Sequence, residues 1–126
     1  MKTLFLSLSL VALIAAAPLS SAHAQAAAKS ALPVAALRSI RENAEAAQQN
    51  ANIYQWARVN REVDRVVADA RKVQKALSAD SALAKQGQEF ADAVSALRSA
   101  RLAHSPERIA AAADKLAALC ESLLKN

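Results

Sequence analysis

The chain has 126 residues, 54% of them hydrophobic, and a formal net charge of +5 at pH 7. This length suits one domain with a modest core, and the single cysteine excludes a disulfide within the chain. No glycine-rich phosphate loop, paired catalytic carboxylates or Ser/His/Asp arrangement occurs in the sequence, so nothing in it supports an enzyme.

The first 24 residues have the pattern of a secretory signal peptide. Lys2 provides the positive start, an uncharged apolar run extends from Leu4 to Ala17, and Ala22-His23-Ala24 is an A-x-A cleavage signal. The run is shorter than the roughly 20 residues that cross a bilayer. We therefore expect cleavage before Gln25, a periplasmic or secreted protein, and no membrane-spanning segment after cleavage. An uncleaved membrane anchor is the alternative.

Removal of residues 1–24 leaves 102 residues, of which 28 are alanine. We expect a flexible N-terminal segment at 25–31 and one folded domain at 32–126. Alanine buries little area, at about 25 cal/mol per Å², so the core is thin. Stability is expected to be modest unless a partner or a homodimer adds burial.

Apolar residues then recur at alternating steps of three and four, which predicts four amphipathic helices at about 32–50, 53–78, 81–103 and 106–125. The stripes are Leu37, Ile40, Ala44, Ala47 and Ala51; Trp56, Val59, Val63, Val66, Ala70, Val73 and Leu77; Leu83, Gly87, Phe90, Val94 and Leu97; and Ile109, Ala113, Leu116, Cys120 and Leu123. No stretch alternates as a strand does. Gly87 is interpreted as a residue tolerated at a close helix contact rather than as a notch for a ligand.

The breaks between stripes carry capping signals. Pro33 suits the first turn of a helix, and the segment 78–81 (SADS) offers N-cap residues. The segment 104–107 (HSPE) reads as a cap, a first-turn proline and an acid favoured by the helix dipole. The asparagines of 50–52 mark the softest boundary.

A short phrase occurs twice, as AALRSIR at 35–41 and SALRSAR at 95–101. These two segments lie 60 residues apart. After each of them comes a second helix, and there Arg58-Val59 matches Arg108-Ile109 at an offset of 50. We interpret this as a helical hairpin used twice, with ten extra residues in the first connection, and chance similarity in an alanine-rich chain is the alternative. The predicted fold is all-α: an antiparallel up-down-up-down four-helix bundle made of two similar hairpins.

This architecture resembles exported four-helix cytochromes of the b562 and c′ type. Covalent haem attachment in such proteins needs C-x-x-C-H, whereas the last helix here has a lone Cys120. A methionine–histidine axial pair needs a methionine, and Met1 is lost with the signal peptide. The resemblance therefore implies the shape without the haem, and we expect no cofactor and no metal site.

Cys120 and His104 are the only thiol and the only imidazole of the mature chain. About 20 Å of helix separates them, which excludes a shared metal ion or a Cys–His dyad within one monomer. Cys120 continues an apolar stripe, so we expect a buried thiol, with an intermolecular disulfide as the alternative.

Arg58, Arg61, Arg65 and Lys72 follow one side of the second predicted helix. Glu62, Asp64 and Asp69 stand three or four residues from them and are expected to offset much of their charge, which favours a solvated face. Export argues against nucleic-acid binding. An anionic envelope surface or an envelope protein remains a partner for this face.

In an up-down-up-down order the first and third connections meet at one end of the bundle. Pairing the second and third helices around residue 80 sets Trp56 beside His104, with Tyr54, Arg101 and Glu107 nearby. These five residues are our candidate recognition surface, in which the rings supply binding area and His104 supplies pH sensitivity. The alternative is that the rings only plug the end of the bundle.

The sequence favours a non-enzymatic exported binding or interaction module. A carrier of haem or a metal ion is the second hypothesis.

Overall fold

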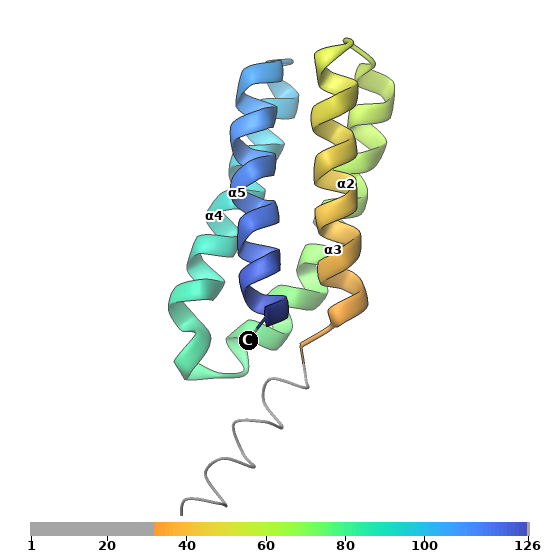
Figure 1. Ribbon diagram of the computed structural model, residues 1–126. Helices are drawn as coiled ribbons and strands as arrows, with labels where there is room; N and C mark the ends of the chain where they lie inside the picture. The colour runs from red at the N-terminus through yellow and green to blue at the C-terminus, as the bar shows by residue number, and fades with distance from the viewer. Residues whose placement is uncertain (1–31, 126) are drawn as a thin grey trace, which may run out of the picture. The chain divides into compact units, whose positions relative to one another are not determined.

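Figure 1 shows the computed structural model, which describes residues 32–125. This part of the chain is all-helical and contains no strand. Its α-helices are α2 (Val34–Asn52), α3 (Trp56–Ser78), α4 (Ala84–Leu102) and α5 (Pro106–Lys125), with a short 3₁₀ turn, η1 (Ser81–Leu83), before α4. Four helices were predicted, and the arrangement is consistent with a four-helix bundle. The predicted signal peptide (1–24) and N-terminal segment (25–31) lie outside the described residues.

The four helices surround one apolar core. Each of α2 and α4 packs against both α3 and α5, so the contacts form a closed ring. The predicted stripes supply this core: all of their members are buried except Trp56 and Leu83, which pack partly buried against it, and half-buried Gly87. Nine of the 24 buried apolar residues are alanines, as expected for a thin core.

The helix ends follow local chemistry, with one difference from the sequence prediction. Asp80 caps η1 by accepting a hydrogen bond from Ala82 N at 2.9 Å, and Pro106 opens α5 behind Ser105, whose Oγ accepts from Arg108 N at 3.3 Å. Pro33 instead stays outside α2 in an extended conformation, although its carbonyl accepts a hydrogen bond from Leu37 N at 3.0 Å. The helix therefore begins one residue after the proline.

The two helix pairs repeat at a single offset of 50 residues. Helices α2 and α4 are both 19 residues long, and α3 and α5 begin at 56 and 106. Buried positions 59, 62, 63, 66, 70 and 73 of α3 correspond to buried positions 109, 112, 113, 116, 120 and 123 of α5. The predicted ten extra residues in the first connection are therefore wrong, because 53–55 and 103–105 have the same length. The two LRS segments lie near the start of α2 and near the end of α4, so they do not occupy equivalent positions of the repeat.

The two connections also share their hydrogen bonds. In the first, Tyr54 N donates to Ala51 O at 3.0 Å and Gln55 N to Asn50 O at 2.9 Å. In the second, His104 N donates to Arg101 O at 3.1 Å and Ser105 N to Ala100 O at 3.3 Å. This pair of bonds is the Schellman arrangement, which ends a helix on a residue with positive φ. Figure 1 shows both connections at the same end of the helices. We call this end the tip: residues 53–55 and 103–105 with the helix turns beside them.

Candidate functional site

The tip is built on two strained backbone positions. Tyr54 and His104 have φ of 59° and 48°, a conformation in which glycine is the unstrained residue. They are the non-glycine residues of positive φ among those described. A bulky ring at each position therefore costs stability, and such strain is concentrated at functional sites.

Trp56 and His104 lie together, as the pairing of α3 with α4 predicts. Their ring centroids are 4.7 Å apart and the ring planes differ by 22°, a stacked geometry. Trp56 is half-buried against the core, whereas His104 is exposed. The indole thus closes the end of the core, and the imidazole covers the outer face of the indole.

Arg101 connects α4 to α3 beside this stack. Its Nη1 atom lies 2.5 Å from Asp64 Oδ1 and 3.4 Å from Asn60 O, and only 19% of its side chain is exposed. Glu107 is exposed in the first turn of α5, and no ion pair or hydrogen bond within residues 32–125 links it to the other candidates. Arg101 therefore orders the tip, while Glu107 only borders it.

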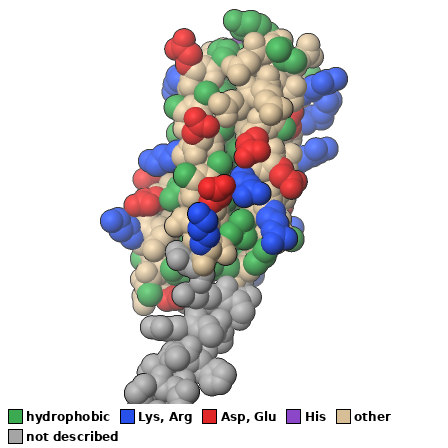
Figure 2. All heavy atoms as spheres, in the orientation of Figure 1, with side chains coloured by type: hydrophobic (Ala, Val, Ile, Leu, Met, Phe, Trp, Pro, Cys, Tyr) green, Lys and Arg blue, Asp and Glu red, His purple; other side chains and the backbone are tan. Residues whose placement is uncertain are grey.

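The tip also holds two exposed apolar residues, Ile53 and Leu102, that were not singled out from the sequence. Ile53, Tyr54 and Leu102 are 61%, 71% and 80% exposed, and together with Val34 they are the exposed large hydrophobic residues of the described chain. Figure 2 shows hydrophobic side chains at this end of the molecule. Leu102 stands five residues after Leu97, out of step with its stripe, which is the signal that could have revealed it.

The basic residues on one side of α3 are not all paired with the acids that the sequence predicted for them. Asp69 pairs with Lys72 at 3.9 Å and accepts a hydrogen bond from Ser39 Oγ at 2.7 Å, but Asp64 turns to Arg101. Glu62 is buried and accepts a hydrogen bond from the Asn50 amide. Within residues 32–125, the predicted compensation therefore fails for Arg58, Arg61 and Arg65, which form no ion pair there.

Cys120 is fully buried and unpaired in the apolar stripe of α5, as predicted. Burial raises the pKa of its thiol to about 12, against a smaller lowering by the Arg41 guanidinium. A thiol in this state is a poor nucleophile, and the alternative of an intermolecular disulfide would require α5 to open.

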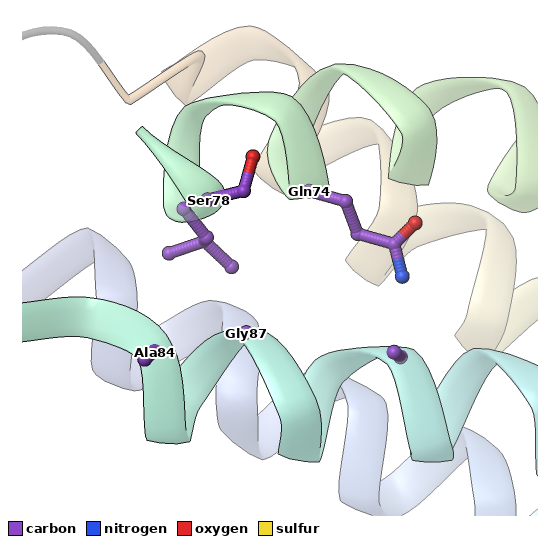
Figure 3. Close-up of a pocket in the computed structure, with 6 residues that line it drawn as sticks. Gln74, Ser78, Ala84 and Gly87 are labelled. Atoms are coloured by element: carbon purple, nitrogen blue, oxygen red, sulfur yellow. The ribbon is translucent and has the colours of Figure 1, made fainter. Parts of the chain in front are cut away.

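A hollow lies between α3 and α4, at the far end of α3 from the tip. Its volume is about 510 Å³, and its walls are Gln74, Leu77, Ser78, Ala84, Gly87 and Ala91. Figure 3 shows the Gln74 side chain reaching from α3 toward α4, with Ala84 and Gly87 opposite. A Cβ atom on Gly87 would lie 3.6 Å from Leu77 Cβ, an ordinary contact, so helix packing does not require glycine here. The hollow is mainly apolar, and the Ser78 hydroxyl already donates to Lys75 O at 3.0 Å.

Comparison with protein families, curated proteins and solved structures finds no match to this chain. Within residues 32–125, no helix is long and apolar enough to cross a membrane, and no three His, Cys, Asp or Glu side chains gather to hold a metal ion.

Proposed function

We propose that the chain is an exported, non-enzymatic binding module that recognises its partner with the tip. The supporting observation is the tip itself, where Ile53, Tyr54 and Leu102 expose apolar surface around the Trp56–His104 stack. Large exposed apolar side chains that gather at one place mark interaction surfaces. The plug interpretation accounts for Trp56, which closes the core, but not for Tyr54 and Leu102, which face solvent.

The proposal includes the up-down-up-down order of the helices. Three-residue connections after α2 and α4, the closed ring of contacts and the Trp56–His104 stack all support it. Export to the periplasm or the cell exterior rests on the signal-peptide pattern of residues 1–24.

Site-specific photo-crosslinking in the exporting cell tests the proposal. Benzoylphenylalanine replaces Tyr54 at the tip or, as the matched control, Ser81, which is exposed in η1 at the opposite end of α3. We expect irradiation to join an envelope component to position 54 and not to position 81. Equal adducts at the two positions, or none at position 54, would show that the tip does not bind.

Native mass spectrometry of the exported protein tests the remaining parts of the proposal. We expect an N-terminus at Gln25 and no bound prosthetic group. Haem or a metal ion recovered with the protein would instead support the second hypothesis, a carrier.

A further inference from the structure

Basic side chains surround the apolar tip. Arg58 and Arg108 are exposed in the first turns of α3 and α5, at equivalent positions of the repeat. Arg61 of α3 and Arg98 of α4 are also exposed, each about one helical turn farther from the connections at the tip. None of these four arginines forms an ion pair with another residue in 32–125. Their charges therefore remain available to an anionic partner.

The acidic residues of the same turns do not cancel this charge. Residues 50–64 and 98–108 contain five arginines and three acids, a net charge of +2. Glu62 is buried, and Asp64 is paired with the inward-lying Arg101. Of the three acids, this leaves Glu107, which is exposed and forms no ion pair within the described chain. At the tip, exposed apolar side chains are therefore surrounded by basic ones.

The exposure of the apolar side chains indicates which kind of partner this surface can bind. Tyr54 and Leu102 are 71% and 80% exposed, so they project from the tip instead of lining a hollow. Projecting side chains of this kind can enter a bilayer interface, which deforms around them and needs no preformed pocket. Tyrosine and tryptophan suit the headgroup level of a bilayer, and arginine reaches lipid phosphates while its stem stays in apolar surroundings.

We propose that the tip inserts Ile53, Tyr54 and Leu102 into the surface of a bilayer that contains anionic lipid, with Arg58 and Arg108 at the level of the phosphates. This inference rests on the proposed function, since it names the partner of the same surface. Apolar insertion and attraction to anionic headgroups act together at such an interface, as they do for amphipathic helices.

The single tryptophan of the chain makes the test specific for the tip. Trp56 emission is measured on the exported protein with vesicles of phosphatidylcholine, with and without phosphatidylglycerol, whose acyl chains carry bromine, a quencher that acts over a short distance and so reports insertion of the neighbouring tip residues. The mass of the protein is checked first, so that the state of residues 1–24 is known. We expect quenching with the mixed vesicles, loss of quenching at high salt, and little quenching with phosphatidylcholine alone.

Matched variants separate the two contributions. Leu102→Ser and Ile53→Ser together should abolish the quenching, whereas Val34→Ser, an exposed apolar residue outside the tip, should leave it unchanged. Arg58→Ala and Arg108→Ala should each weaken vesicle binding about fivefold, the effect of one basic residue at an anionic surface. Arg71→Ala, at an exposed arginine in the last third of α3, is the charge control. Helical circular dichroism establishes that each variant is folded.

The outcomes distinguish this inference from the proposed function. Absence of quenching together with a protein adduct at position 54 would overturn the lipid partner and keep the tip as a binding surface. Absence of both would overturn both proposals. Equal quenching by neutral vesicles, or full binding after loss of both arginines, would refute the selection for anionic lipid.

Discussion

Tyr54 and His104 occupy equivalent backbone positions, yet their rings have different surroundings. The Tyr54 ring is 71% exposed, whereas His104 stacks on Trp56. Tyr54→Gly relieves a strain of about 1 kcal/mol and loses little packing, so urea unfolding should show equal or greater stability. His104→Gly relieves the same strain but loses a stack worth about 0.5–1.5 kcal/mol, so it should be less stable than Tyr54→Gly. A Tyr54→Gly variant that is the less stable of the two would contradict this assignment.

Cys120 should make stability depend on alkaline pH. Its thiol has a pKa of about 12 in the fold and an ordinary value of 9.0, so between these pH values it ionises only in the unfolded chain. The free energy of unfolding should then fall by about 1.4 kcal/mol per pH unit as the pH rises through that range. Tyrosine and lysine titrate there too, so the measurement compares the slope with that of Cys120→Ala, which carries the residue found at the equivalent position 70. Equal slopes would show that the thiol is not shielded.

Gly87 lies within helix α4 and also lines the hollow between α3 and α4, so a substitution there affects both helix propensity and packing. Alanine at this position gains up to about 1 kcal/mol in helix propensity, and its Cβ would make an ordinary 3.6 Å contact with Leu77. Thermal unfolding should therefore show a higher midpoint for Gly87→Ala. A lower midpoint would mean that the space beside Gly87 is narrower than the 510 Å³ hollow indicates.

At the scale of helix pairs, α2 and α3 share a polar contact that the repeat lacks. Asn50 donates to Glu62, whose other carboxylate oxygen is buried without a partner in the described chain, while the equivalent positions 100 and 112 are alanines. Asn50→Ala leaves a buried carboxyl without its donor and should cost about 1–3 kcal/mol. Adding Glu62→Ala to that variant should restore most of this loss, because it installs the alanine pair of the second repeat. Urea unfolding of the two single variants and the double variant measures the coupling, and additive losses would contradict it.

The helices could be predicted because each carries a continuous apolar stripe, and capping at Asp80 and Pro106 follows from local sequence. The predicted soft boundary at 50–52 is close to the observed one, since α2 ends at Asn52, but the Asn50 side chain bonds Glu62 on the next helix and not its own backbone. That contact joins residues 12 apart, which no local pattern reveals. The offset of the repeat was misread for a related reason, since burial and turn geometry recur at 50 while the matching LRS words do not.

At the scale of the whole molecule, the Trp56–His104 pair could be predicted from helix order alone, because antiparallel helices of similar length bring both connections to one end. The exposure of Ile53 could not, because a sequence does not show which residues remain after the stripes are buried, and Leu102 was overlooked although it is out of step with its stripe. The uncompensated arginines were missed since spacing of three or four residues permits an ion pair, whereas Asp64 and Glu62 have partners on other helices.

The repeat makes a prediction about how the chain can be cut and rejoined. At an offset of 50, Lys125 corresponds to Lys75 and Val34 to Ala84, so the stretch 76–83 that joins α3 to α4 should also span from α5 to α2. Figure 1 shows the end of α5 and the start of α2 at the same end of the helices. A permuted chain that begins at Ser81, joins Lys125 to Val34 through a copy of 76–83 and ends at Asp80 should keep the same fold, since exposed connections tolerate new termini.

Circular dichroism and Trp56 emission, measured on the permuted chain, report whether the helices and the His104 stack are retained. The matched control has the same junction copy appended after Lys125 without permutation. If that control folds and the permuted chain does not, the two helix pairs are not interchangeable, because the joining stretch of one cannot serve the other. A permuted chain with unchanged helicity and Trp56 emission would show that the fold is two equivalent helix pairs closed around one alanine-rich core, in which the order of the pairs along the chain is immaterial.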